Sequence, residues 1–269
     1  MTNDFDTVPP ESQPDDKGGS RQPLLTVLRA LSILRLFDGK VEWLGVREIA
    51  RLLDMNSASV HNLLRTLAGE GLLEQHPETK KYRLGLGLVA LAGIKLSQMG
   101  LVSYATPLMR ELMHETEETT ILATLYRNEL LFLARFESSH LLRVASQMGG
   151  SAPLHCSAVG KVLLAFQSPD RIEAVLSGPL EKFTSRTVTD PALLREELER
   201  IRTQGFAVDF GGYIDGVHAV AAPVQDHSAQ VVAALGLVVP ASRFPTDKLS
   251  EFTTKLVQTA RQISRALGA

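Results

Sequence analysis

The sequence contains a single cysteine, Cys156, and few aromatic residues, which make up 6% of its 269 positions. One cysteine excludes a disulfide within the chain and fits the reducing cytoplasm, where we expect the protein to work. The longest apolar run, LGLGLVALAGI, stops at Lys95 and is too short to cross a bilayer. A secretory signal, a glycine-rich phosphate loop, HExxH and CxxC are also missing. We therefore predict no membrane partner, no cofactor and no bound metal.

Charge is distributed unevenly, although the whole chain carries a formal net charge of −2. Residues 1–20 hold one basic and five acidic residues among many Pro, Ser and Gly, which predicts a disordered acidic tail. Residues 21–84 hold ten basic and seven acidic residues. That balance suits nucleic acid, although many solvated surfaces have the same balance.

The apolar spacing of residues 21–85 predicts a winged helix-turn-helix domain. Three helical segments come in order: PLLTVLRALSILRLF, GVREIARLLDM and NSASVHNLLRTLAGEG. The face that the first of them is expected to bury consists of Val27, Ala30, Leu31, Leu34 and Phe37. The segment LLEQHPETKKYRLG then predicts two short strands joined by a turn, which together form a wing.

Residues 86–102 form a predicted linker helix that is apolar on nearly every side, so it needs burial all round. We expect it to pack against a second copy of the chain. Helix character resumes at Thr106, with Pro107 in the first turn. Residues 103–269 predict an α+β domain. Its expected features are hairpins at Arg127–Asn128 and at 226–228, a third strand in LLRVASQ, and a closing helix from Thr246.

Four motifs resemble the IclR family of bacterial transcriptional regulators: KKYRLG, PLHCSAVGKVLLAF, GFAVDFGGYIDGVHAVAAPVQD and VVAALGLVVP. The resemblance extends over residues 22–267. It implies an N-terminal winged helix, a linker helix used in dimerisation, and a GAF-like effector-binding domain with an antiparallel sheet flanked by helices. It also implies a homodimer or homotetramer that binds double-stranded promoter DNA and responds to a small organic acid. The expected function is transcriptional regulation and not enzyme catalysis.

The outward side chains of the third helix and two basic residues of the wing are predicted to contact DNA. Hydroxyl and amide groups near a helix N-terminus suit base edges and phosphates, and basic side chains suit phosphates. The predicted DNA-binding residues are Ser57, Ser59, His61, Asn62, Arg65, Lys81 and Arg83. The alternative is a solvated helix face without a ligand.

The effector is expected at the start of the helix in SAVGKVLLAF. Ser157 is predicted to cap this helix, leaving the N–H groups of Ala158, Val159 and Gly160 to hold a carboxylate. The resemblance adds other positions, and the predicted effector-binding residues are Leu141, Val144, Ala158, Val159, Asp209, Ala219, Gly236 and Val238. Small or apolar residues at several of these positions replace polar ones of relatives. This favours a roomy apolar pocket and an aromatic carboxylate, with ordinary core filling as the alternative.

Cys156 directly follows His155, a pair that invites a catalytic interpretation. A base must reach the sulfur in space, however, and it usually comes from a distant part of the chain. We predict a packing role for Cys156 and a hydrogen-bonded structural role for His155. A metal- or redox-switched regulator and a cysteine-dependent enzyme are the alternatives. His218 could line the pocket or face solvent, because the strand alternation does not decide.

Overall fold

The structure, a computed structural model, describes residues 24–37, 41–141, 152–244 and 246–269. The chain divides into two compact units, an N-terminal one up to Leu84 and a second from Gly85 to Ala269. The predicted tail, Val144 and most of the predicted strand LLRVASQ lie outside the described residues.

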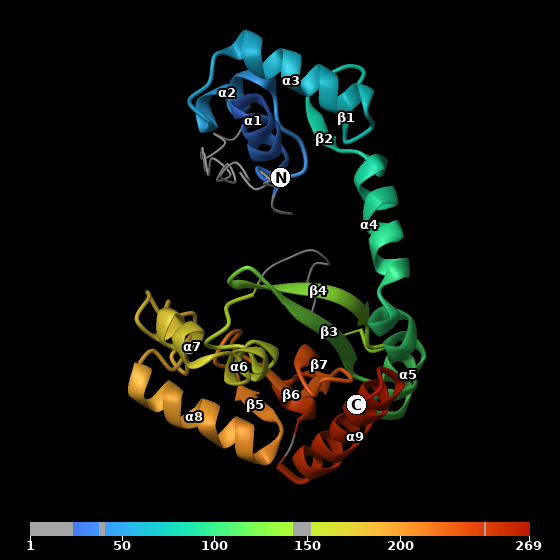
Figure 1. Cartoon of the computed structure of the whole chain (residues 1–269), viewed down its shortest axis with the longest axis vertical. Helices are drawn as coiled ribbons and strands as arrows, with labels where there is room; N and C mark the ends of the chain where they lie inside the picture. Colours follow the sequence, from blue (N-terminus) through green and yellow to red (C-terminus); the bar gives the residue numbers. More distant parts are fainter. Residues whose placement is uncertain (1–23, 38–40, 142–151, 245) are drawn as a thin grey trace, which may run out of the picture. The chain divides into compact units, whose positions relative to one another are not determined.

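The first unit is a winged helix-turn-helix, as predicted. It contains α1 (Leu25–Leu34), α2 (Val46–Leu52), α3 (Ser57–Gly69), β1 (Leu73–Gln75) and β2 (Tyr82–Leu84) (Figure 1). The strands pair antiparallel, and Leu44 extends the pairing by a bridge to Tyr82. Asn56 caps α3 by accepting a hydrogen bond from the Ala58 N–H, and this fixes the start of the helix.

The predicted inward face of α1 is confirmed in part, because Ala30, Leu34 and Phe37 pack half-buried against the core of this unit. Ile33 is the residue of this helix that is buried, in one cluster with Leu44 and Ile49. Val27 and Leu31, which were expected inside, are 52% and 42% exposed. The helix is apolar on several sides, so its periodicity does not select the side that packs.

The second unit begins with two helices, α4 (Leu86–Gln98) and α5 (Gly100–Thr116), which meet at a bend of 87°. The linker helix is therefore shorter than predicted, and its successor starts earlier. Pro107 lies inside α5 and not in its first turn, a correction to the prediction. No residue of α4 is fully buried, and four of its large apolar side chains are exposed: Leu86, Val89, Leu91 and Ile94.

A membrane-spanning helix needs a minimum length and an apolar composition. Among the described residues no single helix is both long and apolar enough to cross a membrane. The bent pair α4 and α5 passes the same test by length and composition alone.

The core of the second unit is a five-stranded antiparallel sheet in the order β4-β3-β7-β6-β5. The strands are β3 (Thr119–Tyr126), β4 (Glu129–Phe136), β5 (Ala207–Phe210), β6 (Val217–Gln225) and β7 (Val231–Pro240). Both predicted hairpins are confirmed, at Arg127–Asn128 and at 226–230. The α+β class and the antiparallel sheet flanked by helices are thus confirmed.

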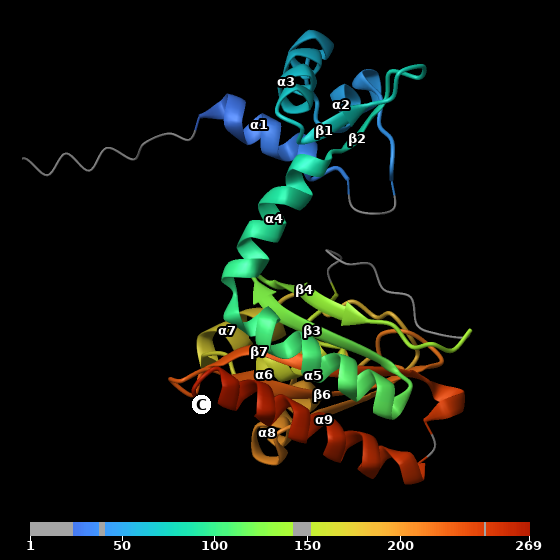
Figure 2. The same ribbon diagram turned by 90° about the vertical axis from the view of Figure 1, so that its right-hand side faces the viewer.

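Helices cover both faces of this sheet (Figures 1 and 2). One face packs against α5 and against α9 (Thr246–Ala266). The other carries α6 (Ala158–Ala165), α7 (Pro169–Leu176) and α8 (Pro191–Gln204). Two separate apolar clusters result, one on each face of the sheet.

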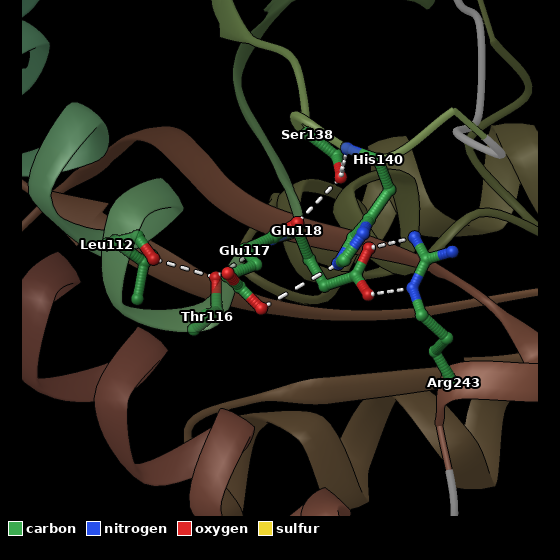
Figure 3. A network of polar contacts seen from close by, with 7 residues as sticks. All are labelled: Leu112, Thr116, Glu117, Glu118, Ser138, His140 and Arg243. Atoms are coloured by element: carbon green, nitrogen blue, oxygen red, sulfur yellow. Dashed lines mark hydrogen bonds and ion pairs between the residues drawn. The ribbon is translucent and has the colours of Figure 1, made fainter.

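A buried ion pair ties the start of β3 to the short 3₁₀ turn after β7 (Figure 3). Glu118, whose side chain is 3% exposed, accepts two hydrogen bonds from Arg243 at 2.6 and 2.8 Å. Beside it, the Ser138 hydroxyl donates to the Glu117 carbonyl at 2.6 Å and accepts from the His140 N–H at 3.2 Å. The residues that follow β4 are thereby held against the junction of α5 and β3.

Candidate effector cavity and DNA-binding surface

The recognition helix α3 presents the predicted side chains to solvent. Val60, Leu64 and Leu67 are buried, so the helix packs along one stripe. The predicted DNA contacts on the other side are all exposed: Ser57, Ser59, His61, Asn62 and Arg65. Hydroxyl, amide and cationic groups therefore share one accessible face.

The wing holds Arg83 in place within the protein itself. Its guanidinium lies 3.0 Å from the Glu74 carboxylate and 3.4 Å from that of Glu42, and 4.8 Å from the centre of the Trp43 ring. A phosphate would compete with two carboxylates for this arginine. Lys81, in contrast, is exposed and forms no ion pair with the described residues.

An apolar cavity of about 70 Å³ lies between the sheet and the start of α6. Six of the predicted effector residues line it: Ala158, Val159, Asp209, Ala219, Gly236 and Val238. Leu141 does not, because its side chain is fully exposed. The remaining lining residues were not predicted: Ile121, Phe132, Ala152, Ser157, Tyr213, Ile214, Val217 and Val220.

Two backbone donors at the start of α6 face no acceptor among the described residues. The Ser157 hydroxyl accepts a hydrogen bond from the Gly160 N–H at 3.2 Å. Contrary to the prediction, the Gly160 N–H is therefore not free to bind a ligand carboxylate. The N–H groups of Ala158 and Val159 belong to the first turn, where a helix supplies no partner. Together with the positive end of the helix dipole, they form a seat for an anion.

The glycine at position 236 does not add the room expected of it. Gly236 pairs with Ile121 across β7 and β3. A Cβ atom on Gly236 would lie 2.8 Å from Val159 Cγ1 and 2.9 Å from Ile121 Cγ1. These two side chains occupy the space that a larger residue would fill, so the cavity is narrow at this point.

Of the described residues that line the cavity, Asp209 alone carries a carboxyl group, and it is 6% exposed. Burial raises its pKa, against the opposing effects of the Lys161 charge and of the Gly212 N–H, which donates to Oδ1 at 2.8 Å. Lys161 is itself buried, and its ammonium pairs with Glu197 at 2.8 Å. The nearest cation is thus already bound to another carboxylate.

Cys156 and His155 do not form a nucleophile and its base. His155 donates from Nε2 to the Glu181 carbonyl at 2.9 Å, which confirms the structural role predicted for it. Burial, followed by the charge of Asp209, raises the pKa of the Cys156 thiol to about 12. Because the thiolate is the reactive form, the sulfur is held in its unreactive state.

We expect Cys156 to resist iodoacetamide at pH 8 in the folded protein and to be alkylated once guanidinium unfolds the chain. Mass spectrometry of the intact protein measures both states. Labelling of the folded protein at the rate of a free thiol would contradict the burial and the raised pKa, and would support the enzyme alternative.

His218 lies on the face of the sheet opposite to the cavity. Its ring packs edge-on against Phe210 at 5.2 Å and Phe244 at 5.5 Å, and Phe244 belongs to the cluster under α5 and α9. Ala219, the next residue of β6, lines the cavity. The alternation of side chains along the strand did not decide whether His218 lines the pocket. In the structure, His218 does not line the cavity.

Two family models match the chain, one for each unit. The IclR helix-turn-helix domain matches residues 26–77, and the bacterial transcriptional regulator IclR C-terminal domain matches residues 94–265. The chain belongs to the IclR family. The family suggested by the four motifs is confirmed.

Individual IclR-family members match over nearly the whole chain. The HTH-type transcriptional regulator XynR of Escherichia coli is 34% identical over 90% of this chain and 97% of its own. BhcR of Paracoccus denitrificans is 35% identical over 93% and 88%. A crystal structure of an IclR homolog complexed with 4-hydroxybenzoate, from Microbacterium hydrocarbonoxydans, matches with TM-score 0.81 and 29% identity over 90% and 98%. This protein is thus a DNA-binding transcriptional regulator of the IclR family.

Metal ligands do not gather in the part of the chain that the structure describes. There, no group of three or more His, Cys, Asp or Glu side chains converges on a point.

Proposed function

We propose that this regulator binds an aromatic carboxylate in the cavity at the start of α6 and that the acid changes its affinity for promoter DNA. The observation that carries the proposal is the pair of unpartnered N–H groups of Ala158 and Val159 at the edge of an apolar cavity. The N–H groups suit a carboxylate, and the lining suits a ring. The relative crystallised with 4-hydroxybenzoate supports an acid of this class.

The cavity must widen when such a ligand enters. Ligand cavities usually measure about 300–1,000 Å³, and this one measures about 70 Å³. Tyr213 and Ile214 line it from the connection between β5 and β6, outside the regular elements, so we propose that the cavity widens there. The side chains of Tyr213 and Ile214 would move when the acid binds.

A panel of acids tests the ligand class. The melting temperature of the whole protein is measured with benzoate, 4-hydroxybenzoate, pyruvate and glyoxylate, because a ligand that binds the folded state raises it. We expect the two aromatic acids to raise it and the two small acids to leave it unchanged. The reverse result would contradict the proposed ligand class.

The second copy expected for a homodimer would pack on α4. This helix exposes four large apolar side chains over its length, a pattern typical of an interface. Residues 85–117 connect the two units through α4 and α5 and would carry the effect of the acid to the DNA-binding unit. Analytical ultracentrifugation of Val89→Glu, which we expect to be monomeric, tests this arrangement.

Arg65 is proposed to contact a DNA phosphate from the exposed face of α3. Arg65→Ala should weaken binding to promoter DNA and reduce the slope of log Kd against log salt by about 0.9, the effect of one phosphate contact. Arg200→Ala, which removes an exposed arginine from α8 in the second unit, is the control and should leave both unchanged. An unaltered slope for Arg65→Ala would remove this residue from the DNA-binding surface.

A further inference from the structure

We infer that the acid binds together with one proton, which Asp209 takes up, so that the carboxyl group of Asp209 becomes a hydrogen-bond donor to the ligand. The inference rests on the proposed function, because it concerns the charge balance of the same cavity. Asp209 would then determine which ligands the cavity binds.

The geometry brings two acidic groups into one small apolar space. Asp209, Ala158 and Val159 line the same cavity of about 70 Å³, and the N–H groups of Ala158 and Val159 belong to the first turn of α6, where the helix supplies no acceptor. A ligand carboxylate at those N–H groups would therefore lie close to the Asp209 carboxyl. Two carboxylates that share an apolar site do not both stay ionised, and one of them takes a proton.

Cations that could remove this conflict are engaged elsewhere. Of the described residues that line the cavity, none is basic. Lys161 is bound to Glu197 at 2.8 Å, and Arg186 donates to the Phe210 carbonyl at 3.0 Å. Within the described part of the chain, Asp209 thus has no dedicated counter-ion.

The groups around Asp209 come from every element packed against it. They are Cys156, just before α6, Lys161 of α6, Glu181 and Arg186 of the segment before α8, Glu197 of α8, Tyr213 of the connection after β5, and His218 of β6. Burial is the largest influence on the pKa of Asp209 and raises it, which means that the carboxyl is already disposed to hold a proton. A second negative charge raises the pKa further.

Protonated Asp209 would then contribute to recognition directly. Its Oδ1 accepts from the Gly212 N–H at 2.8 Å, and the Tyr213 N–H also donates to this carboxyl group. The proposed proton is assigned to Oδ2. An O–H donor beside two N–H donors suits a monocarboxylate, which presents acceptors alone. A ligand with a second negative charge at this end would be rejected.

Calorimetry of the intact protein with benzoate and with 4-hydroxybenzoate, in two buffers of different ionisation enthalpy, counts the protons taken up. Both acids keep their carboxylate ionised between pH 6 and about 8, the range to be covered. Since the bound state holds one more proton, binding tightens as pH falls. We expect uptake approaching one proton, and Kd rising up to about tenfold per pH unit where free Asp209 is ionised.

Asp209→Asn is the matched variant, because its amide keeps an acceptor for the Gly212 N–H and supplies a donor without titrating. We expect it to bind benzoate without proton uptake and with little dependence on pH. If the variant does not fold, the proton count on the natural sequence decides alone, and benzamide, which is neutral throughout, serves as the ligand control without uptake.

Three results would overturn the inference. Binding of benzoate without proton uptake at any pH in this range would leave the proposed function intact but contradict the uptake of a proton by Asp209. A pH slope retained in Asp209→Asn would assign the proton to another group. Loss of 4-hydroxybenzoate binding alone in Asp209→Asn would make Asp209 an ionised acceptor for the ligand hydroxyl. If no acid binds either protein at any pH, the proposed function fails as well.

Discussion

Arg243→Met is expected to lower the free energy of unfolding by about 3–5 kcal/mol. The reason is the position of Glu118, whose side chain is 3% exposed and accepts two hydrogen bonds from Arg243 (Figure 3). Removing the arginine leaves a buried carboxylate without its partner, and breaking a buried pair on one side costs far more than replacing both partners. Urea unfolding followed by circular dichroism measures the loss.

Two variants serve as controls for this prediction. In Glu118→Met/Arg243→Met both charges are replaced by apolar chains, and most of the lost stability should return. Arg195→Met breaks the pair with Glu173, in which both side chains are about half exposed, and should cost less than about 1 kcal/mol. A loss of similar size in Arg243→Met and Arg195→Met would contradict the account of the buried pair.

Gly160→Ala is expected to destabilise the second unit by about 3 kcal/mol and to abolish the response to the acid. A Cβ atom on Gly160 would lie 2.6 Å from the Leu154 carbonyl oxygen, and 2.7 Å from both the Pro153 carbonyl oxygen and Ser157 Oγ. Backbone oxygens cannot rotate away, so the segment before α6 must move. That movement would displace the capped N-terminus that seats the ligand.

Gly69→Ala is the control for Gly160→Ala, because a Cβ there would meet nothing within 4 Å. We expect it to leave stability unchanged or slightly higher. The readouts are urea unfolding and the rise in melting temperature with benzoate. Natural stability and a natural benzoate response in Gly160→Ala would show that the start of α6 is not the ligand seat.

Local signals in the sequence predicted much of the fold correctly. The Ser157 cap of α6 depends on residues next to one another in the sequence, and it is found. The two hairpins were also readable, since each pairs strands that are close in sequence. Neighbouring residues determine these features, so no tertiary contact is needed to predict them.

Errors arose where distant residues decide the outcome. The inward side of α1 is selected by contacts of Ile33 with Leu44 and Ile49, which the helix pattern does not contain. Pro107 was placed in a first turn because proline is favoured there, yet α5 begins earlier and accommodates it. The contacts of Arg83, which stays a predicted DNA contact, with Glu42 and Trp43 were not foreseen either, because both residues are far away in the sequence.

The residues of the candidate cavity also differ in whether local signals or distant contacts place them. Ala158 and Val159 follow from the cap alone, and Asp209 came from the motif around it. Ile121 was missed because its place beside Gly236 follows from the register of β3 on β7, two strands far apart in the chain. Tyr213 and Ile214 were missed because the connection after Asp209 has no periodicity, although its nearness to Asp209 was a usable signal.

The most direct test of the account is binding to the DNA immediately upstream of this protein's own reading frame. Fluorescence anisotropy across a salt series, with and without benzoate and 4-hydroxybenzoate, measures operator binding and effector response together. We predict saturable binding that weakens steeply with salt and changes with an aromatic acid. Equal affinity for this fragment and for random DNA at every salt, with no effect of any acid, would contradict the account.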